Sequence, residues 1–307
     1  MSCSIGPPSA GTLKAAEQIF NEAVAIDPEL ADAYKGLACI RYERSQYPEA
    51  EAMCRVALEK ARAELRTDEP AAFTWWGDLS TRPYMRARHT LGLAFWRQGK
   101  YREAIAEFQE MLKRNPNDNQ GVRYLIGPLY HLSGDLRAAI AAYKAASPDP
   151  DSVGDSTNEL SYGLALFQLK RYPAAVLRYR YAFFLNLYLP QVVLSGKVTR
   201  FDIWHGSNLA ESEYALDYWE NYGLLWRGQT EAVRFLRLVY KDEEVRSELD
   251  AFIENATKLG TEDDIRARGP LVDEHMRFKN LERIKETNPQ IAVRVLGRYG
   301  PAAAVIH

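Results

Sequence analysis

The feature that most constrains the fold of this chain is a helical segment that returns at a nearly constant interval. Each copy is centred on an alanine within an amphipathic pattern. The five alanines are Ala16, Ala50, Ala104, Ala139 and Ala175. The intervals between them are 34, 54, 35 and 36 residues. Three intervals match the period of a repeated helix pair, and the fourth exceeds it by roughly 20 residues, which predicts one insertion.

The residues that follow each alanine repeat as well. A larger side chain comes four residues later, and a further apolar residue comes three residues after that. The larger residues are Phe20, Cys54, Phe108, Tyr143 and Tyr179, and the later ones are Ala23, Ala57, Met111, Ala146 and Ala182. These offsets place all three positions on one helical face. A single helix pair cannot bury such a face alone, so the pattern predicts a stack of pairs.

A glycine also recurs in the helix that precedes each aligned helix. Gly92, Gly127 and Gly163 each lie twelve residues before their alanine, and Ala38 takes that place in an earlier copy. A glycine inside a helix costs about 1 kcal/mol relative to alanine. Its recurrence therefore indicates close contact between helices. The turn between the two helices is expected at Gly99 and Gly134, and at Ser45 and Lys170 in the other copies.

This glycine, alanine, aromatic and alanine pattern resembles the tetratricopeptide-repeat family over roughly residues 12–190. Within it, residues 81–126 (TRPYMRARHTLGLAFWRQGKYREAIAEFQEMLKRNPNDNQGVRYLI) resemble suppressor-of-tumorigenicity-7-like proteins and their soluble tetratricopeptide relatives. The resemblance implies an all-α fold, an α-α superhelix or solenoid with C-terminal capping helices. It also implies a protein-binding role and transfers no catalytic residue.

We expect three parts along the chain. Residues 1–11 are rich in Gly, Pro and Ser and are predicted to be disordered. Residues 12–190 hold the repeats, with the insertion at about 67–83. Residues 191–307 hold the rest: an irregular segment (about 187–209) with some extended structure, a degenerate helix pair and terminal helices.

The insertion carries two adjacent tryptophans, Trp75 and Trp76. Two interpretations are open. Both rings could pack against the solenoid, or they could serve as a hydrophobic anchor for a partner.

Pro128 is expected inside a helix, directly after Gly127. A proline there removes the hydrogen bond to the Tyr124 carbonyl and bends the helix. The bend could open a small-molecule or catalytic pocket bordered by Tyr124 and His131, or it could be a tolerated kink without a ligand.

The resemblance implies that the first helix of each pair lines a concave groove. The predicted groove residues are Lys35, Tyr42, Arg86, His89, Trp96, Arg97, Tyr124, His131 and Phe167. The repeat at 85–114 carries seven Lys/Arg against three Glu. Arginine pairs carboxylates through two hydrogen bonds, and aromatic rings offer flat contact area. We therefore predict a protein or peptide partner with acidic and apolar residues. The alternative is a solvated charged face without a specific ligand.

Composition argues against several other functions. The formal net charge of −2 gives no global basic field for nucleic acid. The five histidines form no metal-binding motif, and no phosphate loop or nucleophile elbow is present. His205, beside Trp204 and near Asp202, is the best single catalytic candidate, although a structural role explains it equally well. We expect a non-enzymatic protein without cofactors or metal.

The expected location is the cytoplasm, without membrane contact. The three cysteines form no C-x-x-C pair and no disulfide framework. The N-terminus lacks a signal pattern, and the most apolar stretch, 181–195, is too short to span a membrane. A self-assembling structural module is a further alternative, because the first copy lacks its first helix and leaves one end of the stack open.

Overall fold

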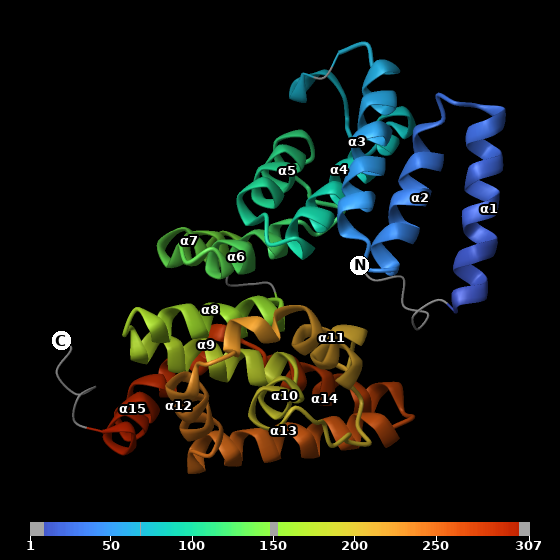
Figure 1. Cartoon of the computed structure of the whole chain (residues 1–307). Coiled ribbons are helices and arrows are strands. Elements are labelled where there is room, and N and C mark those ends of the chain that lie inside the picture. The colour runs from blue at the N-terminus through green and yellow to red at the C-terminus, as the bar shows by residue number, and fades with distance from the viewer. Residues whose placement is uncertain (1–8, 68, 148–152, 301–307) are drawn as a thin grey trace. The chain divides into compact units, whose positions relative to one another are not determined.

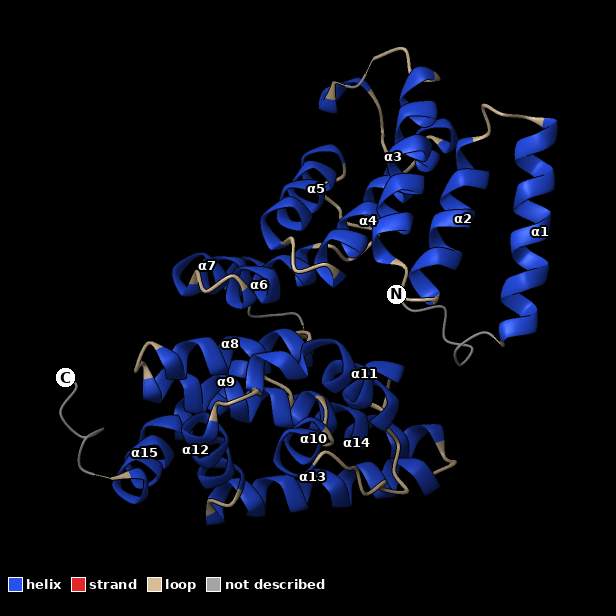
Figure 2. Ribbon diagram, in the orientation of Figure 1, coloured by secondary structure: helices blue, strands red, loops and turns tan. Residues whose placement is uncertain are grey.

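The computed structural model describes residues 9–67, 69–147 and 153–300, and throughout these ranges the secondary structure is helical, without a strand (Figure 2). The predicted all-α repeat fold is therefore confirmed. The chain divides into two compact units, Met1–Gly134 and Asp135–His307. Each unit is described by itself below.

The first unit is a run of helices in which each packs on the next (Figure 1). Its α-helices are α1 (Ala10–Ile26), α2 (Ala31–Glu43), α3 (Tyr47–Ala63), α4 (Arg82–Arg97), α5 (Tyr101–Arg114) and α6 (Arg123–Leu132). Two short 3-10 helices, Pro70–Ala72 and Leu79–Thr81, lie between α3 and α4. Helix α2 also contacts α4 directly, so the first helices of two successive pairs lie side by side.

The second unit begins with the later copies of the repeat and then adds helices that cover them. It contains α7 (Leu136–Ala146), α8 (Ser156–Gln168), α9 (Tyr172–Leu185), α10 (Leu189–Ser195), α11 (Ser212–Tyr222), α12 (Thr230–Tyr240), α13 (Glu243–Thr261), α14 (Ile265–Phe278) and α15 (Leu281–Tyr299). Its 3-10 helices are Asn208–Ala210 and Gly223–Trp226. Helices α8 and α9 form a pair, and α9 also contacts α12, α13 and α15.

Two of the three recurring glycines, Gly92 and Gly163, have the packing role that the sequence indicates. A Cβ atom on Gly92 would lie 2.5 Å from the ring of Phe108, and a Cβ atom on Gly163 would lie 2.5 Å from the ring of Tyr179. Both rings are fully buried. Gly36, which the alignment of the repeats missed, makes the same kind of contact with Phe20. The aromatic residue of one helix thus occupies the space that a glycine leaves on its neighbour.

The turns inside the pairs also follow the sequence. Gly99 and Gly134 have φ angles of 73° and 85°, and Ser45 and Lys170 have φ angles of 59° and 58°. All four residues are in the left-handed region, where glycine is unstrained and other residues are uncommon. The turn geometry is therefore kept in copies that do not have the favoured residue.

Two local expectations need correction. Residues 9–11 are ordered: Ser9 caps α1, its Oγ accepting a hydrogen bond from the Thr12 backbone N–H at 3.2 Å, while residues 1–8 lie outside the described part. The segment at about 187–209 begins with the short helix α10, which the sequence analysis did not predict, and is irregular from 196 to 207. The chain turns from α9 into α10 at Asn186, whose Oδ1 accepts a hydrogen bond from the Tyr188 N–H at 2.9 Å. Leu189 and Val193, which lie four residues apart on one face of α10, are both buried.

A buried arginine fastens the terminal helices to α9. Arg180 is fully buried, and its guanidinium donates to Glu248 at 2.8 Å, to Thr287 at 2.7 Å and to the Ile284 carbonyl at 3.0 Å. These partners lie on α13 and α15. These charge-assisted hydrogen bonds satisfy most of the donors of the buried guanidinium. They also hold α13 and α15 against the α8/α9 pair.

Candidate functional site

The structure distributes the predicted groove residues over four helices. Lys35 and Tyr42 lie on α2, and the four residues from Arg86 to Arg97 lie on α4. Tyr124 and His131 lie on α6, and Phe167 lies on α8 in the second unit. Because α2 and α4 contact each other, their residues form one continuous surface. We call this surface the α2/α4 face and define it by Asp32, Lys35, Tyr42, Arg86, His89 and Arg97.

One end of the α2/α4 face is closed by an ion pair. The Arg86 Nε lies 3.2 Å from Asp32 Oδ1, and its Nη2 lies 2.5 Å from Oδ2. Both side chains remain nearly 40% exposed, so the pair is accessible to solvent. This arrangement changes the role expected of Arg86. The Nε and Nη2 groups of Arg86 already donate to Asp32, so a ligand carboxylate must compete with Asp32 for them.

The other end of the face is closed by Arg97 and Tyr42. The Arg97 Nε donates a hydrogen bond to the Tyr42 hydroxyl at 2.8 Å, and its guanidinium lies 5.9 Å from the centre of that ring. It lies 5.4 Å from the ring centre of Trp96, which is only 7% exposed. Burial raises the pKa of Tyr42, although the charge of Arg97 opposes that shift. Tyr42 is therefore a neutral donor and acceptor at neutral pH.

Between these two contacts lie Lys35 and His89. Lys35 is half-buried and makes no ion pair or hydrogen bond with another described residue. His89 is half-buried and packs 6.1 Å, centre to centre, from the ring of Phe108. Burial, aided by the charge of Lys35, lowers the pKa of His89 to about 4. At neutral pH the middle of the face therefore carries one unpaired positive charge, that of Lys35, beside a neutral imidazole.

The family comparison agrees with this architecture. Residues 89–153, which begin in α4 and continue beyond α7, match the family model of the tetratricopeptide repeat. The chain contains tetratricopeptide repeats. A search of curated proteins found no match. The narrower resemblance of residues 81–126 to suppressor-of-tumorigenicity-7-like proteins stays a prediction.

The tetratricopeptide repeats do not expose every predicted groove residue. On α6, Tyr124 is 37% exposed but His131 is only 7% exposed, and Pro128 lies inside the helix as expected. The pocket proposed around Pro128 would thus have a buried histidine on one side, and it stays a prediction.

Phe167 is unavailable to a ligand because the chain itself covers it. It is 8% exposed, and its ring centre lies 5.1 Å from that of Phe235 on α12, 5.5 Å from Tyr172 and 6.0 Å from Tyr299 on α15. The placement of Phe167 in an open groove is therefore corrected. The apolar character of α8 could have given a warning, since a helix that is apolar all round is usually buried.

The insertion packs against the first unit. Trp75 is 1% exposed, contacts Tyr84 at 5.4 Å between ring centres and has the Arg114 guanidinium 5.1 Å from its ring centre. Trp76 is half-buried, with Arg82 5.2 Å from its ring centre. For Trp75 the packed interpretation is confirmed, because its surface is not available as an anchor.

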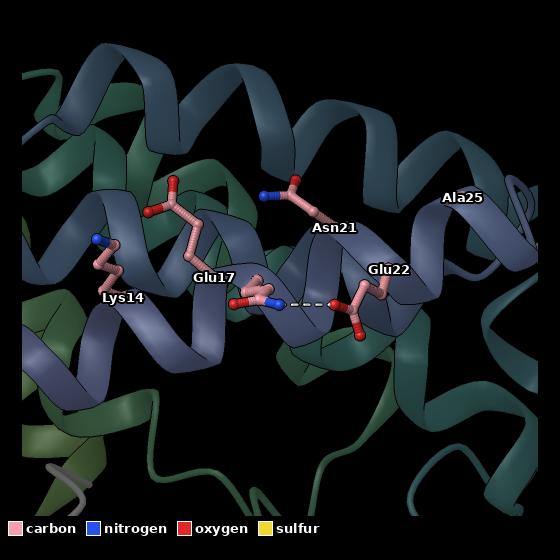
Figure 3. Close-up of a pocket in the computed structure, with 6 residues that line it drawn as sticks. Lys14, Glu17, Asn21, Glu22 and Ala25 are labelled. Carbon is pink, nitrogen blue, oxygen red and sulfur yellow. Dashed lines mark hydrogen bonds between the residues drawn. The ribbon is translucent and has the colours of Figure 1, made fainter.

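A separate hollow lies along α1 and is wide open to solvent (Figure 3). It is lined by Lys14, Glu17, Gln18, Asn21, Glu22 and Ala25, a spacing that follows one helical face. Glu17 is already paired with Arg41 and Arg44 at 2.7 Å each, and Gln18 donates to Glu22 at 2.9 Å. Internal pairing uses several of its polar groups, so the hollow is a weaker candidate than the α2/α4 face.

No helix in the described part of the chain combines the length and apolarity that crossing a bilayer requires.

Proposed function

We propose that this protein is a non-catalytic scaffold that holds a segment of another protein on the α2/α4 face. The observation that carries the proposal is Lys35, a half-buried cation without an ion-pair partner among the described residues. It lies between two contacts that join neighbouring repeats, Asp32–Arg86 and Tyr42–Arg97. Stacked tetratricopeptide repeats form extended concave surfaces of this kind, which are used for binding.

The chemistry of the face favours a partner segment with acidic and apolar side chains. A carboxylate beside Lys35 would gain an ion pair without breaking an existing one. A second carboxylate could share Arg86 with Asp32, since that pair is partly exposed. Tyr42 offers a flat apolar surface, and aromatic residues of this type are enriched in interfaces. The described residues of the α2/α4 face include no unpaired acidic cluster that would bind a basic segment. They also include no basic cluster that would bind nucleic acid. We further propose a cytoplasmic location.

A selection from a library of short random peptides tests the proposal. The selected peptides should be rich in Asp or Glu and in apolar residues. Lys35→Glu should weaken their binding at least tenfold, since it replaces an attraction by a repulsion. Arg102→Glu is the matched control, because Arg102 is exposed on the outer helix α5 and has no ion-pair partner among the described residues. Selection of basic peptides, or unchanged binding by Lys35→Glu, would refute the proposal.

A second candidate, self-assembly, is favoured by one observation on α1. This helix buries no residue, and it exposes Ile19 by 62% and Ile26 by 86%, seven residues apart on the same face. A second copy of the chain could cover this face. Light scattering of wild type and of Ile19→Glu over a range of concentrations would decide. A dimer that the substitution dissolves would support assembly, and a monomer at all concentrations would eliminate it.

A further inference from the structure

A small, partly open cavity in the second unit brings three basic side chains together. Its lining residues come from α9, α13, the C-terminal end of α14 and the loop before α11. His205, His275 and Lys279 line it, and the other lining residues are apolar or aromatic, with Trp204 and Phe252 as the largest walls. No carboxylate is among the lining residues. Three potential cations thus face one space without an internal counter-charge.

His275 is the group that most needs a partner. It is only 2% exposed, and neither ring nitrogen has a hydrogen-bond partner among the described residues. Its ring is fixed between Phe252, stacked at 4.6 Å between centres, and Trp204, edge-on at 5.1 Å. A buried polar group without a partner is rare in native proteins and points to a bound water, ion or ligand. Here the rigid aromatic walls prevent the ring from turning to solvent.

The charge of Lys279 favours an anion over a water molecule as the occupant of the cavity. It makes no ion pair with another described residue, and its ammonium lies 5.7 Å from the ring centre of Phe252. Burial lowers its pKa to about 8, so it is mainly charged at neutral pH. A water could satisfy His275, but it would leave this charge uncompensated. A small anion could accept hydrogen bonds from both side chains and neutralise the charge.

His205 forms the opposite part of the lining. Its Nε2 lies 2.8 Å from the Tyr188 hydroxyl, which also accepts from the Phe201 N–H at 3.1 Å. The loop is further held by a hydrogen bond from the Trp204 N–H to the Ala256 carbonyl at 3.0 Å. These bonds fix the cavity before any ligand binds. The cavity holds about one water-sized sphere, which also suits a small ion.

We propose that this cavity binds one oxygen atom of a small carboxylate such as formate, held by His275 and Lys279. The site is separate from the α2/α4 face and goes beyond the protein-binding function proposed above.

The test uses sodium formate and nuclear magnetic resonance of the histidine side chains in the full-length protein. Formate should shift the His275 ring signals saturably, whereas a bulky sulfonate at the same ionic strength should not. Lys279→Met should abolish the saturable shift, because it keeps the apolar stem but removes the charge. Lys241→Met, at an exposed lysine, is the matched control and should leave the shift unchanged.

The wild-type protein gives a second readout that needs no variant. Raising the pH above about 8 deprotonates Lys279, so formate affinity should fall at least tenfold across that range. A shift that never saturates would assign the cavity to water and overturn the proposal. Equal binding by Lys279→Met, or affinity that is constant above the pKa of Lys279, would overturn it as well.

Discussion

The helix pairs α4/α5 and α8/α9 share the contacts between their two helices, but they differ in what covers the first helix of each pair. Each packs a glycine against a buried aromatic ring, and each joins its helices by an ion pair. The charges are reversed between the pairs: the base is on the first helix in Arg88–Glu107, and the acid is on the first helix in Glu159–Arg178. In these two pairs an ion pair joins the helices, but the helix that carries each charge differs between them.

The faces of α4 and α8 that carry the predicted groove residues have different surroundings. His89 of α4 corresponds to Leu160 of α8, and Trp96 corresponds to Phe167, at the same distances from their glycines. His89 is half-buried in a polar face, whereas Leu160 is fully buried. Trp96 and Phe167 are both buried, at 7% and 8% exposed, and Phe167 packs on the later helix α12. The same backbone unit can thus leave one face of its first helix partly exposed, or have that face covered by the chain's own later helices. The residues on that helix decide which.

The largest expected difference between the two faces is in stability. Phe167→Ala should cost about 3–5 kcal/mol, because it leaves a cavity in a buried aromatic cluster. Arg86→Ala should cost about 0–1 kcal/mol, since it removes an exposed ion pair. Chemical denaturation of both variants measures these values. Similar costs for the two would show that the faces are not covered differently.

Histidines in both units should make stability depend on pH. Burial lowers the pKa of His275 to about 4, and that of His89 likewise to about 4, whereas unfolded histidine has a pKa near 6.5. The unfolded state then takes up protons first, so stability is full above pH 6.5 and falls as the pH drops towards 4. His275→Phe should remove on the order of 1–3 kcal/mol of this loss. An unchanged profile would mean that the imidazole is not desolvated.

Glycine substitutions should separate packing from helix propensity in the two pairs. Gly92→Ala and Gly163→Ala should each destabilise by about 1–3 kcal/mol, because the new methyl group would overlap an aromatic ring. Gly297→Ala in α15, where nothing lies within 4 Å, should instead stabilise by about 0.5–1 kcal/mol. Thermal unfolding is the measurement. Stabilisation by all three would contradict the close packing of Phe108 and Tyr179.

The smallest effect concerns the turns. Lys170→Gly should stabilise the α8/α9 pair by about 0.5–1 kcal/mol, because Lys170 has a positive φ that glycine adopts without strain. Gly99→Ala should destabilise α4/α5 by a similar amount for the same reason. Differential scanning calorimetry can resolve both shifts. A loss of stability in Lys170→Gly would mean that the lysine side chain has a compensating contact.

Features set by short sequence distances were predictable. The glycine–aromatic contacts and the left-handed turn residues repeat at fixed offsets, so the sequence contains them directly. Contacts over long distances were not. Asp32 reaches Arg86 across 54 residues, and Arg180 reaches Ile284 across 104 residues. Arg86 carries no local signal of the partner that it will meet. The apolar character of α8 indicates that Phe167 is buried, but it does not identify the helices that cover it. The sequence analysis therefore overestimated how much of the groove is open.

Amide hydrogen exchange with and without a selected acidic peptide tests the proposed division of roles most directly. The account predicts added protection in α2 and α4, with exchange in α8 and α9 unchanged because their faces are already covered. Protection confined to α8 and α9, or absent from α2 and α4 while the peptide is bound, would contradict it.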